Sequence, residues 1–114
     1  MRHAYALALT FLGAIPNAHA ARPTVPNVRD GTPYAQARQS LIQAGNIPVD
    51  FRKQGRCVAE NRDVCELYPE VEECAIDGPR PCNFSWTTAG HAPFIVTTVG
   101  EKVDDLKVEA VTPR

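Results

Sequence analysis

The chain has few of the residues from which metal and catalytic centres are built. Its 114 residues include three histidines, four cysteines, one tryptophan and one methionine. A phosphate-binding glycine loop, a G-x-S-x-G element and a C-x-x-C pair are all missing. These absences argue against the common nucleotide-binding, serine-hydrolase and dithiol redox classes. We therefore expect no cofactor and no metal ion.

The chain also lacks an excess of charge of one sign. Lys and Arg number 12 and Asp and Glu number 13, which gives a formal net charge of −1. The charges are interspersed, without the basic stripe that follows phosphates, so nucleic acid is not an expected partner. A mild acidic cluster is interpreted as a solvated face; its members are Glu70, Glu72, Glu73 and Asp77.

Only one long apolar run is present, and it lies near the N-terminus. Residues 4–15 are apolar or small, Arg2 precedes them, and Ala18-His19-Ala20 follows with small residues at the positions that a signal peptidase reads. The run is shorter than the roughly 20 residues needed to span a bilayer. We expect residues 1–20 to be a cleaved secretory signal. Residues 21–114 would then be one small domain without a membrane span, in the periplasm or secreted.

A helix is predicted over residues 33–44. Thr32 suits the N-cap position, and Pro33 suits the first helical turn, where its missing N–H costs nothing. Apolar residues then recur every three or four positions, at Tyr34, Ala37, Leu41 and Ala44. Gly45 is placed to end the helix in a left-handed conformation.

The rest of the chain divides into three parts. Ile47, Val49 and Phe51 alternate with polar or turn residues and predict a short strand. Residues 52–82 are rich in turn residues and cysteine and predict an irregular excursion, with one turn of helix near 64–68. Residues 83–112 contain three alternating segments separated by turns, which predict an antiparallel β-meander.

These elements predict the α+β class, with one helix packed on a three- to four-stranded antiparallel sheet beside a disulfide-stapled excursion. The helix stripe and one face of the strands should form the core. Residues expected to be buried are Tyr34, Ala37, Leu41, Phe84, Trp86, Phe94, Val96, Leu106 and Val108. Residues expected to be exposed are Arg38, Gln39, Lys107 and Glu109.

The four cysteines are predicted to form two disulfides. Cys57, Cys65, Cys74 and Cys82 are separated by seven, eight and seven residues. Structural zinc sites usually bring closer pairs of ligands, and an exported chain favours bridges. Short loops close easily, which favours Cys57–Cys65 with Cys74–Cys82. The nested pairing of Cys57 with Cys82 and Cys65 with Cys74 remains open, because spacing alone does not choose.

Candidate catalytic residues are sparse after residue 20. Ser85 and His91 flank an Ala89-Gly90 turn, and Asp77 could orient the histidine, but no oxyanion loop is recognisable. We do not expect an enzyme. A partner contact is a better use of the excursion, and its candidate residues are Tyr68 and Glu70, which sit in a turn-rich stretch.

Residues 25–45 resemble the opening of a PASTA repeat, an extracellular module of penicillin-binding proteins and their associated kinases. The matching elements are Val25-Pro26-Asn27-Val28, Gly31, Ala37, Leu41 and Gly45. The resemblance implies a strand, a helix and a sheet, with affinity for cell-wall muropeptides. Arg29-Asp30 adds one residue to the family's spacing, and the four cysteines are not part of its pattern.

The chain also resembles a group of small exported bacterial four-cysteine proteins. Their shared pattern is a helix, a four-cysteine middle and a C-x-F-x-W strand, here formed by Cys82, Phe84 and Trp86. The first hypothesis for function is therefore a non-catalytic exported binding module, for which cell-wall glycopeptide is one ligand. The alternative is a protein-directed inhibitor or immunity-type partner of a secreted hydrolase, since pre-ordered loops lose little entropy on binding.

Overall fold

The structure, a computed structural model, describes residues 25–57 and 61–114. The predicted signal, residues 1–20, lies outside the described residues. Within them the chain forms one main helix and a five-stranded antiparallel sheet, with two short 3-10 turns and a second, shorter helix. The predicted α+β class is confirmed, and the sheet has one strand more than expected.

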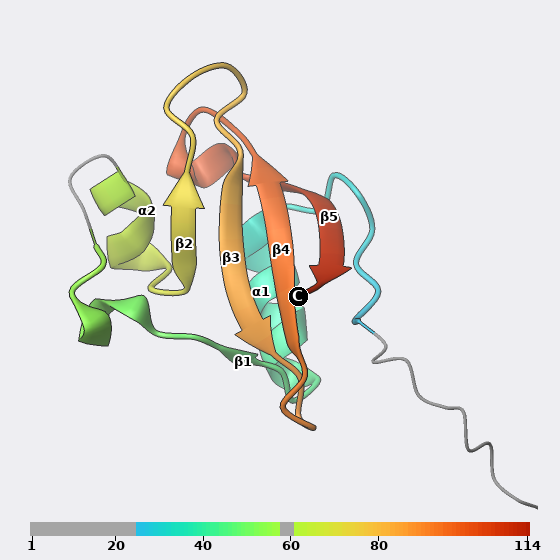
Figure 1. Cartoon of the computed structure of the whole chain (residues 1–114). Coiled ribbons are helices and arrows are strands. Elements are labelled where there is room, and N and C mark those ends of the chain that lie inside the picture. Colours follow the sequence, from blue (N-terminus) through green and yellow to red (C-terminus); the bar gives the residue numbers. More distant parts are fainter. Residues whose placement is uncertain (1–24, 58–60) are drawn as a thin grey trace, which may run out of the picture.

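The sheet is built around the hairpin of β3 (Cys82–Thr87) and β4 (Pro93–Val99). β5 (Lys107–Pro113) pairs with the free side of β4. The other side of β3 carries two strands in tandem, with β2 (Val71–Cys74) beside its start and β1 (Ile47–Pro48) beside its end. The predicted meander is confirmed, and Figure 1 shows its three strands running side by side.

The helix α1 (Tyr34–Gln43) is one residue shorter at each end than predicted. Pro33 takes the N-cap position, and the Thr32 hydroxyl donates to the Arg29 carbonyl instead of capping the helix. At the other end Gly45 has φ 95° and its N–H bonds the Ile42 carbonyl, while the next N–H reaches back to Leu41. This is a Schellman termination, which needs a residue tolerant of positive φ.

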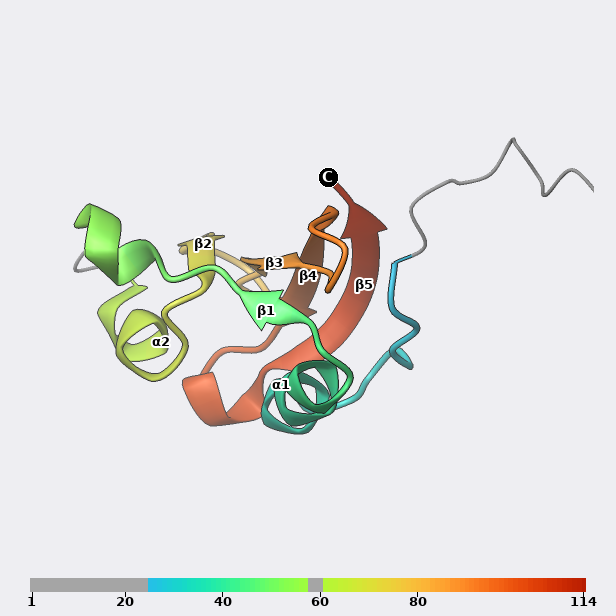
Figure 2. The ribbon, with the colours of Figure 1, turned by 90° about the horizontal axis from the view of Figure 1, so that it is seen from below.

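The core lies between α1 and one face of the sheet, as Figure 2 shows end-on. The Tyr34 ring stacks on Phe84 with centroids 4.0 Å apart, and Trp86 stacks on Phe94 at 6.2 Å. All nine residues predicted to be buried are buried. Gln39, Lys107 and Glu109 are exposed as predicted, but Arg38 is not fully so.

The excursion is more regular than expected. The strand predicted over residues 47–51 stops at Pro48, because the Asp50 carboxylate accepts the Arg52 N–H and starts the 3-10 turn η1 (Phe51–Gln54). The helical turn predicted near 64–68 is the helix α2 (Arg62–Leu67). β2 follows, so the last part of the excursion is one arm of a β-hairpin.

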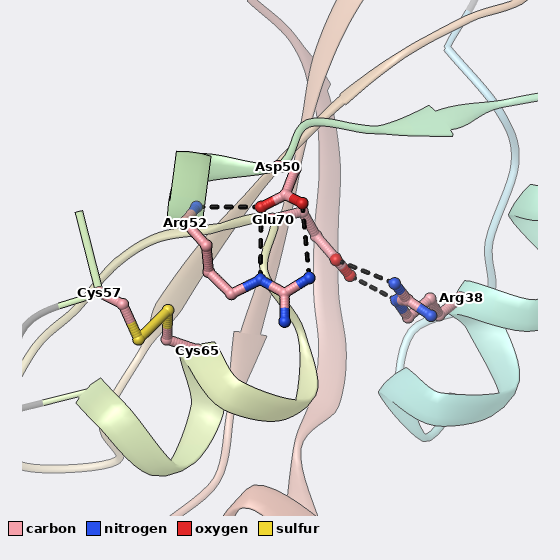
Figure 3. A network of polar contacts seen from close by, with 6 residues as sticks. All are labelled: Arg38, Asp50, Arg52, Cys57, Cys65 and Glu70. Carbon is pink, nitrogen blue, oxygen red and sulfur yellow. Dashed lines mark hydrogen bonds and ion pairs between the residues drawn. A yellow bond between two sulfur atoms is a disulfide. The ribbon is translucent and has the colours of Figure 1, made fainter. Parts of the chain in front are cut away.

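Both disulfides have the pairing that short loops favour. Cys57 bonds Cys65, which fastens the segment after η1 to α2, as Figure 3 shows. Cys74 bonds Cys82, its direct neighbour across β2 and β3, with Cα atoms 4.0 Å apart. No cysteine is free. The nested pairing is therefore excluded.

Candidate functional site

Tyr68 and Glu70, the predicted partner contacts, lie in the interior. Tyr68 is 8 % exposed and Glu70 is 0 % exposed. Both Glu70 oxygens are held by Arg38 from α1, with Nε–Oε2 at 2.6 Å and Nη2–Oε1 at 3.1 Å (Figure 3). The expectation that these two residues form an exposed contact is wrong, because the turn at 68–70 folds under the helix.

A chain of hydrogen bonds continues from Glu70 into the aromatic core. The Tyr34 hydroxyl donates to Glu70 Oε2 at 2.7 Å, and Trp86 Nε1–H donates to the Tyr34 oxygen at 3.1 Å. Burial, reinforced by the neighbouring Glu70 carboxylate, raises the pKa of Tyr34 well above its usual value. The hydrogen bond to Glu70 raises the pKa of Arg38. The Arg38 guanidinium also lies 5.5 Å from the Tyr68 ring centre, a cation–π distance.

This network is structural in its geometry. Each polar atom of the buried carboxylate has a partner, which is the condition for keeping a charge inside a small core. Its effect is to lock the turn that precedes β2 onto α1. The strand that carries Cys74 is thereby held in place, and so is the loop that leaves it.

The loop of residues 75–81 joins β2 to β3 and is closed at its base. The Cys74–Cys82 bridge spans the two strands, and the Ala75 N–H donates to the Pro81 carbonyl at 2.8 Å. Within the loop the Arg80 N–H donates to the Asp77 carbonyl at 3.3 Å. The loop is therefore a tight, cross-linked turn.

Three contacts fix the loop from outside. Arg80, at φ 51°, places its guanidinium on the Asp63 carboxylate of α2 at 3.1 Å and on the Glu101 carbonyl at 3.3 Å. The pairing with Arg80 holds the pKa of Asp63 below its usual range. The Pro79 carbonyl accepts the Gly100 N–H at 2.9 Å. Gly100 is needed there, since a Cβ would stand 2.6 Å from the Asp105 carbonyl oxygen.

Ile76 projects from this fixed loop. It is 75 % exposed, against 43 % for Ile42, 50 % for Ile47 and 53 % for Leu67, the other exposed large apolar residues of the described chain. A single exposed isoleucine is ordinary on a protein surface. Because the loop is closed by the Cys74–Cys82 disulfide and held by hydrogen bonds at Ala75, Pro79 and Arg80, a partner that bound Ile76 would order little further chain.

The residues considered for catalysis do not come together. Asp77 lies in the loop before β3 and His91 in the turn after it, so they lie at opposite ends of the strand. Six strand residues separate such ends by about 20 Å. Ser85 lies between them and is buried, and its hydroxyl donates to Glu72 Oε1 at 3.1 Å. His91 is exposed in the turn between β3 and β4.

The acidic cluster is not a uniform solvated face. Glu73 and Asp77 are exposed as expected, but Glu70 is buried and Glu72 is ion-paired. Arg114 Nη1 lies 2.6 Å from Glu72 Oε1, and this contact lowers the pKa of the Glu72 carboxyl. Two of the four carboxylates are thus parts of the folded framework.

Two shallow hollows lie on the surface of the described residues. One of about 520 Å³ lies between residues 25–30 and β5, and its lining includes Val28, Asp30 and Glu109. The other, of about 280 Å³, lies at the base of the 75–81 loop beside Glu73 and Asn83. In residues 25–57 and 61–114, no group of three His, Cys, Asp or Glu side chains is placed to hold a metal ion. No helix in that part of the chain is long and apolar enough to cross a membrane.

Comparison with known proteins finds no matching family model, no similar curated protein and no similar solved structure.

The sequence pointed to Tyr68 and Glu70, which are buried, and did not single out Ile76, which is exposed. Tyr68 stands out in the sequence because it is aromatic, yet its ring packs in the hydrophobic core. The signal for Ile76 is a lone apolar residue in a proline- and glycine-rich stretch between two cysteines that pair with each other. It becomes visible only after the pairing is known.

Proposed function

We propose that this chain is a non-catalytic exported binding protein that docks on a partner protein through its 75–81 loop. The observation that carries the proposal is Ile76, which is the most exposed large apolar side chain of the described residues and stands on a loop closed by Cys74–Cys82. Interface hot spots are commonly single side chains that fill a pocket on the partner. The specific form of this function is that of an inhibitor or immunity-type partner of a secreted hydrolase, the alternative hypothesis given above.

Rigidity supports binding by the loop. Ordering a rotamer-rich side chain or a loop on association costs about 0.5–1.5 kcal/mol for each group. Here the loop is fastened at its base, at Arg80 and at Pro79 before any partner arrives. Because the loop is already ordered in the folded protein, binding should lose little further entropy. The free energy of burying Ile76 would then contribute to affinity.

Export and the non-catalytic role belong to the same proposal. Two disulfides in so small a chain are typical of oxidising compartments. The secretory-signal pattern of residues 1–20 supplies the means of export. If the signal is cleaved after Ala20, N-terminal sequencing should find Ala21 as the first residue of the exported protein. The separation of Asp77, Ser85 and His91 supports a role without catalysis, and a His91→Ala variant should behave as wild type in every binding assay.

A second candidate ligand is cell-wall glycopeptide, for which the 520 Å³ hollow is the observation. Its walls include residues 25–30, the segment that resembles the PASTA opening. Purified peptidoglycan should retain the protein more than a disulfide-rich control protein if this ligand is bound. Retention equal to that of the control would remove the glycopeptide and leave the protein-directed function standing.

Affinity purification with a matched pair of variants tests the loop. Wild type, Ile76→Asp and Ile42→Asp are tagged, expressed in the producing organism and purified from its extract. Wild type and Ile42→Asp should retain one partner in stoichiometric amount, identified by mass spectrometry, and Ile76→Asp should lose it. Equal recovery with both variants, or no stoichiometric partner with wild type, would refute docking through the loop.

A further inference from the structure

The 75–81 loop shares its end of the sheet with the turn of residues 100–105. Gly100 N–H bonds the Pro79 carbonyl, and Arg80 reaches the Glu101 carbonyl, so the two segments are fastened to each other. Figure 1 shows both at the end of the sheet where β2 and β4 finish. Together, residues 73–81 and 100–105 form one surface, named here the loop end.

The loop end is acidic. Its exposed carboxylates belong to Glu73, Asp77, Glu101, Asp104 and Asp105. None of them makes an ion pair with another described residue. Lys102 is the exposed cation of this surface. Arg80 adds no net charge, because its guanidinium pairs with Asp63.

We infer that the partner presents an apolar pocket bordered by lysine or arginine, an inference that rests on the proposed function. Ile76 would enter the pocket, and the exposed carboxylates of the loop end would face the basic border. Such complementarity chiefly raises the association rate and excludes wrong partners. It also selects the class of partner. Nucleic acid and the surface of an anionic membrane carry the same sign as the loop end, and both would be repelled.

Three synthetic peptides of equal length serve as defined probes. The first combines lysine with leucine, the second replaces lysine with glutamate, and the third replaces leucine with serine. Each is titrated into the ¹⁵N-labelled oxidised protein. The lysine–leucine peptide should shift amide resonances of residues 73–81 and 100–105, and the other two peptides should not. Its affinity should fall by about tenfold between 0.05 and 0.5 M NaCl, because exposed charges are screened.

Variants and outcomes separate this inference from the proposed function. The affinity for the lysine–leucine peptide should fall by several-fold in Ile76→Ser, and also in the double variant Asp77→Asn with Glu101→Gln. Ile42→Ser should leave this affinity unchanged. Equal binding of the glutamate peptide, or shifts centred elsewhere, would overturn the basic pocket. If the peptide experiment fails in this way but affinity purification still recovers a partner that Ile76→Asp loses, then docking through the loop stands and only the basic, apolar chemistry assigned to the partner is wrong.

Discussion

Arg38 on α1 and Glu70 before β2 form a two-pronged ion pair across 32 positions of sequence, with the carboxylate wholly buried and the guanidinium side chain 26 % exposed. A bidentate arginine–carboxylate contact is the strongest form of this pairing. It joins the helix to the turn that leads into the cross-linked hairpin. Loss of this ion pair should therefore lower the stability of the fold and loosen the 75–81 loop.

Arg38→Ala should lower the free energy of unfolding by about 3 kcal/mol, the low end for a broken buried pair, because water reaches part of the Arg38 site. A helix surface residue would change it by less than about 0.5 kcal/mol. Gln39→Ala, an exposed neighbour on α1, is the matched control and should stay within that limit. Urea titrations measure both. Equal, small effects for the two variants would mean that Glu70 is not held by Arg38.

Tyr34→Phe should cost about 1–3 kcal/mol, because it leaves buried Trp86 Nε1–H without its acceptor and removes one of the two hydrogen bonds to Glu70 Oε2. It should also change the alkaline limit of stability. The folded-state pKa of Tyr34 is raised, so its contribution is complete below the unfolded value near pH 10 and is lost as pH rises toward the folded value. Thermal melts between pH 8 and 11 should fall less steeply for the variant. Parallel curves would contradict the buried network.

The acid limit should depend on two surface pairs. Asp63 and Glu72 have lowered folded-state pKa values, chiefly through hydrogen bonds from Arg80 and Arg114. Their stabilisation is present above the unfolded values near pH 4 and is lost as pH falls through the folded ones. Melting temperatures between pH 2 and 6 should therefore decline less steeply in Arg80→Gln and Arg114→Gln than in wild type. A decline as steep as wild type in both variants would contradict these pairings.

The two disulfides provide a matched comparison, since each joins cysteines eight positions apart. Removing either pair as alanines should cost about 2–4 kcal/mol. Only Cys74→Ala with Cys82→Ala should speed hydrogen exchange at the amides of residues 75–81, because only that bridge closes the loop. If removing Cys57–Cys65 speeds exchange at residues 75–81 as much as removing Cys74–Cys82 does, the bridge at the base of the loop is not what orders it.

Gly100→Ala should destabilise the fold by about 2 kcal/mol, because its Cβ would meet a backbone oxygen rather than a side chain that can move. Gly90→Ala is the control, since the nearest atom to its added Cβ is 3.9 Å away. Thermal melts of the two variants should differ accordingly. A neutral Gly100→Ala would mean that the 100–105 turn is loosely held and does not fix the loop.

Local patterns predicted much of the fold. The stripe of Tyr34, Ala37 and Leu41 specified which side of α1 is buried, and the alternation in β3 and β4 specified the inward face. Arg38 could not be placed in this way, because its partner comes from a turn that helix periodicity does not describe. β2 could not be predicted because its four residues do not alternate regularly, and the register of its pairing with β3 shifts between Val71 and Glu73.

The candidate site was only partly predictable. The choice between paired and nested cysteines decides whether residues 75–81 form a closed loop, and spacing alone left that choice open. Tyr68 and Glu70 were selected for type and loop position, yet their burial is set by Arg38 and Tyr34 from another element. Ile76 is exposed on the loop that the Cys74–Cys82 bridge closes. Tertiary contacts, not composition, decided which residue faces outward.

Site-specific cross-linking in cells tests the central claim most directly. A photoreactive phenylalanine analogue is placed at position 76 of the full chain, and at positions 42 and 67 as equally apolar controls on other surfaces. Irradiation should give one discrete adduct from position 76, resolved by mass spectrometry, and none from the controls. An adduct from position 42 or 67 but not from 76, or none from any of the three, would show that the 75–81 loop is not the surface through which this protein acts.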